Sequence, residues 1–483
     1  MKTPKSPTSG RRRLTLRALT ALLLLCSGFA AAPAQAQPEP RREQLLNGLR
    51  VLLWSRPGDQ NVLIKLRVHS GAAFDLAGKE GLMATLVETM FDQQARDYVT
   101  EELGGRLDVA LGYDSIDITM AGRAADFERL LELARNAVTN PQLTPQNFER
   151  IRAARLKSLR ETPVTAAEAA DRAAAARLFG TYPYGRVTAG TPDSLTRAER
   201  TDLLLLRERF LNPDNTTIVI VGGFEPKLVM RSMRESFGGW RKGDRAVPAT
   251  FKLPDPPDER TLVVNQANAA GVELRLALRG LARTDIDSPA AQVVAQVARA
   301  RWLAAMPELK DRAAFVRHDS YRENGIFRLG ASLNSPAEAA RALEAARKVL
   351  GDLSNNAPTP AELDAAKQAA AAALGANASG DEAAANAWLD EHTYRNPAAD
   401  AQALARAAQA LSTGEAQRVA ARLFLHVPLA TVALGDAAQL RTELARAGGV
   451  EVFGEAAAKP TPTPAPTPTP GKQQQPALQL KRP

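Results

Sequence analysis

The segment that decides the fold begins at Gly78, reads Gly-Lys-Glu-Gly-Leu-Met-Ala-Thr-Leu-Val-Glu-Thr-Met-Phe, and ends at Phe91. Thr85 and Thr89 stand four residues apart in it, and Glu88 lies between them. Positions four residues apart share one face of a helix, so a helix here would present both threonines and the carboxylate side by side. A metal can be bound at this spacing when the residues are ligands.

The motifs around this segment follow a definite order. Each is weak alone, and their order and spacing together are specific. Over residues 42–445 they resemble the pitrilysin/insulinase family of metallopeptidases. The motifs that carry the resemblance are Asn47-Gly-Leu-Arg-Val51, Val68-His-Ser-Gly-Ala72, Leu103–Ala110, Tyr182-Pro-Tyr-Gly-Arg186, Gly190–Leu195 and Asn212-Pro-Asp-Asn215.

The resemblance implies a zinc motif that this chain lacks. In that family the helix carries His-x-x-Glu-His: two histidines bind zinc, the glutamate activates the bound water, and a glutamate on a later helix is the third ligand. Here Thr85 and Thr89 stand at the histidine positions and Glu88 is retained. The third ligand falls near Lys157 or Ser158, neither of which binds zinc. We therefore expect no metal, no cofactor and no catalytic residue in this chain.

The histidines of the whole chain support this expectation. There are four, at His69, His318, His392 and His426, and the two closest are 34 residues apart. No register therefore gives a pair of histidines on one helix face. His69 ends a strand just before a turn, where a structural role is expected.

The chain also repeats itself at an offset of about 210 to 215 residues. Strand, helix and Pro-initiated helix follow one another in both halves, and each half closes with a short apolar strand ending in Gly. The matching segments are 116–120 with 326–329, 145–159 with 360–374, and 216–222 with 430–435. We expect an α+β fold of two homologous domains in tandem, each a mainly antiparallel sheet covered by helices.

The expected domain limits follow from these segments. They are a signal peptide at 1–36, a peptidase-like domain with the degenerate motif at 37–250, a linker at 251–258, a second peptidase-like domain at 259–454, and a Pro/Thr-rich tail at 455–483. Within the first domain, the strands Leu49–Trp54 and Val62–Val68 are close in sequence and are expected to pair as a hairpin.

The ends of the chain are basic. A basic start, an apolar run at 18–32 and the small residues Ala34-Gln-Ala36 indicate a secretory signal peptide, so export to the periplasm or the medium is expected. The run is too short for a membrane span. Six basic residues lie in the signal region and four in the tail. Removing these ten from the net charge of +9 leaves −1 for residues 37–458, which argues against nucleic-acid binding.

The tail repeats Pro at alternate positions between 460 and 470, which favours an extended, solvated spacer. Docking of the tail to a surface or a partner is the alternative.

Peptide-binding residues are implied by the resemblance. Val109, Ala110 and Leu111 fall in the family's substrate-binding edge strand, where a peptide can add as an extra strand. In the second half, Lys310, Arg312 and Tyr321 lie near the positions of an Arg and a Tyr that help bind substrate.

Two functions follow. Family members enclose substrate with four such domains, in one chain or two, and this chain has two. The first hypothesis is a non-catalytic subunit that helps a zinc-bearing partner of the family bind extended peptides. The alternative is a homodimeric, non-enzymatic peptide-binding protein.

Overall fold

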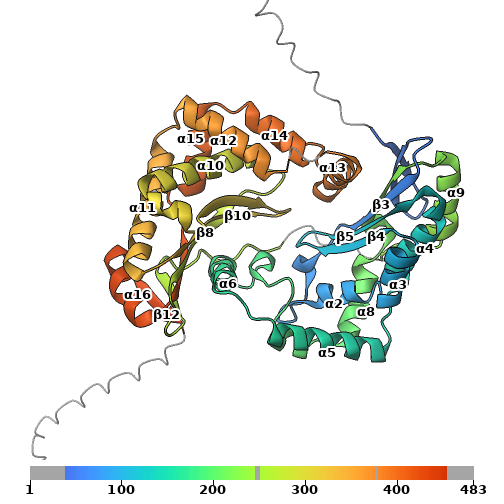
Figure 1. Cartoon of the computed structure of the whole chain (residues 1–483), viewed down its shortest axis with the longest axis horizontal. Helices are drawn as coiled ribbons and strands as arrows, with labels where there is room; N and C mark the ends of the chain where they lie inside the picture. The colour runs from blue at the N-terminus through green and yellow to red at the C-terminus, as the bar shows by residue number, and fades with distance from the viewer. Residues whose placement is uncertain (1–38, 245–250, 376–378, 454–483) are drawn as a thin grey trace, which may run out of the picture. The chain divides into compact units, whose positions relative to one another are not determined.

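The computed structural model describes residues 39–244, 251–375 and 379–453 (Figure 1). The expected signal peptide and the Pro/Thr-rich tail lie outside the described residues. The chain forms two units. Among the described residues, unit 1 contains 39–159, 188–244, 372–375 and 379–404, and unit 2 contains 160–187, 251–371 and 405–453.

Unit 1 is built on a six-stranded sheet in the order β1-β2-β6-β3-β5-β4. Only β2 and β6 run parallel; the other neighbours are antiparallel. The strands are β1 (Arg41–Gln44), β2 (Arg50–Ser55), β3 (Asn61–Val68), β4 (Arg106–Leu111), β5 (Ile116–Arg123) and β6 (Thr216–Gly222).

The expected hairpin between β2 and β3 is wrong, because β6 lies between them. All residues of β6 are buried. A strand that is apolar on both faces belongs at the centre of a sheet, and this preference overrides the closeness of β2 and β3 in sequence.

Helices cover one face of this sheet and bury its main core, which includes Leu49, Leu66, Leu82, Leu130 and Phe237. The helices of this part of the chain are α2 (Leu82–Glu88), α3 (Gln93–Asp97), α4 (Phe127–Thr139), α5 (Pro145–Glu161), α7 (Pro192–Thr196), α8 (Arg200–Phe210) and α9 (Pro226–Phe237), with short turns at Ala72–Phe74, Tyr98–Glu102, Ala124–Asp126 and Pro213–Asn215.

The opposite face of the sheet carries α13 (Asp381–Tyr394), which comes from the second half of the sequence (Figure 1). Trp388 of α13 is buried among Leu52, Val219 and Val221, and its ring meets Trp54 edge-on at 5.8 Å. This second apolar cluster attaches the helix to the sheet.

Unit 2 contains the second sheet, in the order β12-β7-β11-β8-β10-β9. Its β7, β11, β8, β10 and β9 take the same places as β2, β6, β3, β5 and β4, and β7 is parallel to β11 as β2 is to β6. The expected α+β fold in two homologous parts is therefore confirmed. The strands are β7 (Thr261–Asn265), β8 (Val272–Gly280), β9 (Phe315–Ser320), β10 (Gly325–Leu333), β11 (Ala430–Gly435) and β12 (Val450–Phe453).

The core of unit 2 lies between this sheet and a layer of helices, with Trp302, Phe327 and Leu343 fully buried. On the other face lies α6 (Ala166–Phe179), whose Asp171 accepts a 2.6 Å bond from buried Arg275. The remaining helices are α10 (Ser288–Ala305), α11 (Pro336–Asn355), α12 (Pro360–Ala373), α14 (Ala401–Gln409, which spans the boundary of the two units), α15 (Thr413–Phe424) and α16 (Ala437–Leu444), with short turns at Pro183–Gly185, Pro307–Asp311 and Ala445–Ala447.

The two units thus exchange helices: α6 of the first half packs in unit 2, and α13 of the second half packs in unit 1. The sequence-based limits of 37–250 and 259–454 did not anticipate this exchange. Residues 251–258, the expected linker, form no helix or strand. Within the described part of the chain, no helix combines the length and apolar character needed to cross a membrane.

Candidate functional site

The N-terminus of α2 is held by the carboxylate of Asp75 and by a close contact between two backbone segments, residues 80–81 and 189–190. Asp75 accepts from the N–H groups of Gly81 and Met83, each at 2.7 Å. Gly81 has a φ of +92°, and a Cβ on it would lie 2.7 Å from the carbonyl oxygen of Ala189. A Cβ on Gly190 would likewise lie 2.4 Å from the carbonyl oxygen of Glu80. Only glycine permits this contact, which sets the direction of α2.

Thr85 and Thr89 are both buried on α2, each with 1 % of its surface exposed. The hydroxyl of Thr85 donates to the carbonyl of Gly81 at 2.8 Å, and that of Thr89 to the carbonyl of Leu86 at 2.6 Å. Both hydroxyls are therefore satisfied within the helix backbone. The two histidine positions of the zinc motif hold groups that serve the helix itself.

Glu88 is exposed and forms an ion pair with Arg155 of α5. The guanidinium also donates to the carbonyl of Ala189 at 2.7 Å. Lys157 and Ser158, where the third ligand was expected, are exposed. Arg155 of α5 thus bonds to α2, and a fixed positive charge stands beside the retained glutamate.

These residues do not fit zinc, because two of them are threonines whose hydroxyls bond to the helix backbone, neither Lys157 nor Ser158 is a zinc ligand, and Arg155 places a cation beside Glu88. Among the described residues, no group of three His, Cys, Asp or Glu side chains could hold a metal ion. His69 is buried and contacts the hydroxyls of Thr393 at 2.9 Å and Thr217 at 2.8 Å, in a structural position.

The expected edge strand is an edge strand. β4 ends the first sheet, and within the described part of the chain its one partner strand is β5. At the turn between them, Gly112 donates to the carbonyl of Ser115 at 2.9 Å, which makes these two residues a hydrogen-bonded pair. Such pairs alternate along an antiparallel ladder, so Ala110 and every second residue before it bond to β5.

The intervening residues Leu107, Val109 and Leu111 therefore direct their N–H and C=O groups to the free edge. Their side chains lie on the core face, where Val109 and Leu111 are half-buried. Of the three residues named from the sequence, Val109 and Leu111 offer backbone groups to a peptide, while Ala110 offers only its exposed side chain.

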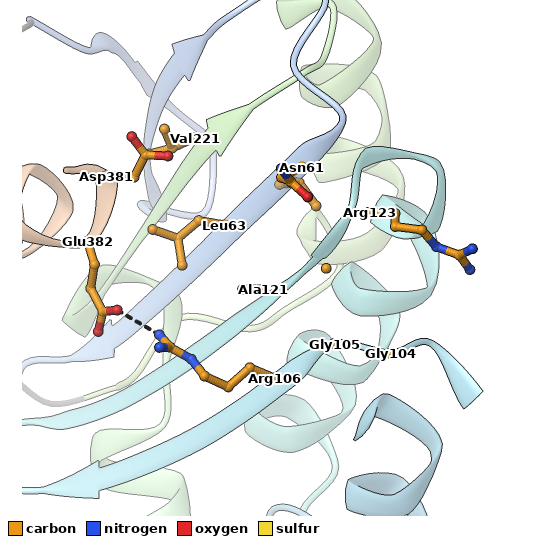
Figure 2. A pocket seen from close by; sticks show the side chains of 12 residues that line it. Asn61, Leu63, Gly104, Gly105, Arg106, Ala121, Arg123, Val221, Asp381 and Glu382 are labelled. Carbon is orange, nitrogen blue, oxygen red and sulfur yellow. Dashed lines mark hydrogen bonds and ion pairs between the residues drawn. The ribbon is translucent and has the colours of Figure 1, made fainter. Parts of the chain in front are cut away.

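A cavity of about 510 Å³ lies beside the start of β4 (Figure 2). Arg106 spans one side of it and donates to Glu382 of α13 at 2.6 Å. Glu382 also pairs with buried Lys65 at 3.2 Å. The hydrogen bond from Arg106 lowers the pKa of Glu382 below its usual value.

Further ion pairs hold α13 on this face, and sequence reasoning missed all of them. Buried Arg67 of β3 bonds to Asp117 and Asp390, both at 2.6 Å. Burial opposes its charge, but the two carboxylates raise the pKa of Arg67 above the ordinary arginine value. The available signal was a single apolar strand, β3, that carries both Lys65 and Arg67, because buried cations require partners.

In the second half, the three expected residues lie in different surroundings. Lys310 is exposed. Arg312 forms a 3.0 Å ion pair with Glu338, whose side chain is 8 % exposed. Tyr321 packs against Tyr184 with ring centroids 4.8 Å apart. Arg312 and Tyr321 therefore contribute to the packing of unit 2. Of the three residues, Lys310 is the one whose side chain is exposed to solvent.

Comparison with known proteins agrees with the fold. The family model described as "Peptidase M16 inactive domain" matches residues 197–370. No curated protein sequence matches the chain.

The chain is similar in structure to a protease from Helicobacter pylori, with a TM-score of 0.73 and 18% identity, covering 83% of this chain and 100% of that one. A peptidase M16 inactive domain from Pseudomonas fluorescens gives 0.70 and 18%, covering 83% and 98%. The first half of the periplasmic protease PqqL from Escherichia coli gives 0.63 and 14%, covering 84% and 95%.

Proposed function

Because this chain belongs to the pitrilysin/insulinase family, peptidase M16, we propose that it is a non-catalytic subunit that helps bind peptide substrate for a zinc-bearing partner of the same family. The partner supplies the metal and the catalytic glutamate. This chain supplies a second pair of domains around the peptide.

One observation carries the proposal: the residues at the zinc positions of α2 are committed to other contacts. Thr85 and Thr89 bond to the helix backbone, and Glu88 is paired with Arg155. A general base in a metallopeptidase must face a metal-bound water. Glu88 instead faces a guanidinium, so peptide cleavage requires a second chain.

The free edge of β4 supports the peptide-binding role. Three residues along it, Leu107, Val109 and Leu111, direct backbone groups outward. An extended peptide can satisfy them as a seventh strand. Exposed strand edges pair readily with other chains, so a peptide bound along β4 would also prevent nonspecific pairing of this edge.

Export is part of the proposal. The basic and apolar residues at 1–36 favour a secretory signal peptide, and one structural neighbour is named as a periplasmic protease. The chain would then bind its partner and the peptide in the periplasm or in the medium.

The alternative is a homodimer that binds extended peptides without cleavage. The free edge of β4 favours it equally, since strand addition needs no metal. The state of association separates the two functions.

The test uses the mature chain and a relative that carries His-x-x-Glu-His, mixed at micromolar concentration. Size-exclusion chromatography with light scattering is expected to show a one-to-one complex. Peptide hydrolysis by the relative is expected to rise on mixing. A chain that stays apart from such relatives and forms its own dimer would exclude the subunit role in favour of the homodimer.

A further inference from the structure

The cavity of Figure 2 has a floor of small and apolar groups. Val221, Leu63, Ala121 and Arg106 stand in one row across β6, β3, β5 and β4, each paired with the next. Their side chains therefore lie on the same face of the sheet. The first three are apolar, and the row ends at the free edge.

Glycines extend this floor toward the edge. A Cβ on Gly105 would lie 2.5 Å from the carbonyl oxygen of Ala121, so only bare backbone fits there. Gly104 has a φ of +61° and open space around the position of a Cβ. Just before Arg106, therefore, two residues without side chains lie between the free edge and the cavity.

The charged side chains around the cavity are neutralised within the protein. Arg106 pairs with Glu382, and Asp381 pairs with Arg56. Arg123 points away from the cavity in Figure 2 and pairs with Asp126 at 2.8 Å. A charged ligand group would compete with these pairs, whereas an uncharged apolar group can cover the floor without disturbing them.

The row also fixes where a bound peptide would lie. A strand added to the edge of β4 continues the row beyond Arg106, and alternate side chains of that strand point to the α13 face. A residue that runs past the start of β4, beside Gly104 and Gly105, can place its side chain over bare backbone and into the cavity.

We propose that this cavity is a specificity pocket for one aromatic or large aliphatic side chain of a peptide bound along β4. The inference rests on the proposed peptide binding and adds to it the class of residue preferred at one position. The volume lies in the range of ordinary ligand sites, so a bulky side chain fits.

The experiment uses the mature chain and labelled extended peptides of Ala, Ser and Thr in which one position is Phe, Leu, Ala, Lys or Glu. Affinities are measured by fluorescence anisotropy. Peptides with Phe or Leu are expected to bind about tenfold more tightly than those with Ala, Lys or Glu. The preference is expected at one position only.

Two variants locate the pocket. Ala121→Phe fills the cavity from its floor and is expected to remove the preference while leaving affinity for the Ala peptide. Ala125→Phe adds the same side chain at an exposed position outside the lining and is expected to leave the preference intact. A photo-crosslinking benzophenone residue at the preferred position is expected to label Leu63, Ala121 or Val221, and this readout needs no variant.

The outcomes distinguish a wrong pocket from the absence of peptide binding. Equal affinity for all the peptides, or crosslinks elsewhere on the chain, would overturn the pocket and leave strand addition standing. Failure of every peptide to bind, with or without the zinc-bearing relative, would overturn peptide binding itself and the pocket with it.

Discussion

Arg155 of α5 bridges α2 and the loop before Gly190: one guanidinium nitrogen donates to Glu88, and the other donates to the carbonyl of Ala189 at 2.7 Å. Its side chain is 13 % exposed, against 43 % for Glu88. A permanent cation therefore stands beside the one residue of the zinc motif that this chain retains. The ion pair joins α2 to α5 at this position.

The first prediction concerns the retained glutamate. Glu88→Gln should leave peptide turnover by the complex within about tenfold of the unmodified level, a barrier change below about 1.4 kcal/mol. The reason is that Glu88 faces Arg155 and no metal-bound water. Steady-state hydrolysis by the complex measures this, and a larger loss would assign Glu88 a catalytic role.

The second prediction concerns rebuilding the metal site. Thr85→His with Thr89→His should not bind zinc tightly, because a third ligand is missing and Arg155 repels the cation. Adding Arg155→Glu should raise zinc affinity by well over tenfold, since it removes the cation and supplies a carboxylate beside α2. Isothermal calorimetry measures the affinities.

The matched control adds Lys157→Glu to the same two histidines. Because Lys157 is exposed and Arg155 is the residue that contacts Glu88, this variant should gain little. Tight binding by the Lys157 variant and not by the Arg155 variant would show that the resemblance placed the third ligand correctly.

Much of the fold was readable from the sequence. The repeat was visible because both halves must build the same sheet from the same succession of apolar segments, and β6 and β11 have equivalent central places. The pairing of β2 with β6 was not readable, since nearness in sequence favours hairpins and only three-dimensional packing places a fully buried strand between β2 and β3.

The site was readable in part. Thr85, Glu88 and Thr89 could be placed because a helix has a fixed period, and β4 because its motif had a family counterpart. The contacts of α13 were beyond reach, because they join Arg67 to Asp390 across more than 300 residues of sequence. The role of Arg155 was missed because no pattern in the sequence indicated which side chain of α5 faces Glu88 across the space between the two helices.

A third prediction separates Lys310 from Arg312. Arg312→Ala should lower the free energy of unfolding by about 1–3 kcal/mol, because it leaves the buried carboxylate of Glu338 without its ion pair. Lys310→Ala, at an exposed position, should leave stability unchanged and weaken peptide binding by the complex. Urea unfolding and peptide affinity, measured on both variants, distinguish these effects. An unstable Lys310 variant would contradict the assignment.

The fourth prediction is a pH dependence of unit 2. His318 is fully buried, accepts from the N–H of Leu281 at 2.9 Å, and lies against Gly280 and Gly325. Burial lowers the pKa of His318 to about 4, from an ordinary value of 6.5. Between these values the unfolded chain binds a proton that the folded chain does not, so stability falls as pH falls from about 6.5 towards 4.

The loss attributable to His318 should reach about 2 kcal/mol between pH 7 and pH 4.5. His318→Gln should show a correspondingly shallower pH dependence in urea unfolding, although its stability at pH 7 will be lower. His426→Gln, at an exposed position, is the control and should retain the full slope. Equal slopes for the two variants would mean that His318 is solvated or charged in the folded protein.

The last prediction tests the direction of the backbone groups along β4. Proline removes an N–H donor and is tolerated on an edge strand where that N–H faces outward. Val109→Pro should therefore keep the fold and weaken binding of extended peptides by about tenfold, because one hydrogen bond to the added strand is lost and the ring obstructs the edge. Ala110→Pro removes an N–H that bonds to β5, leaves the acceptor in β5 without its partner, and should instead destabilise unit 1 by about 1–3 kcal/mol. Circular dichroism melts and peptide affinities on both variants give the answer. If the two variants behave alike, the alternation inferred from the Gly112–Ser115 pair is wrong; if Val109→Pro folds and binds peptide at full strength, β4 is not the peptide edge.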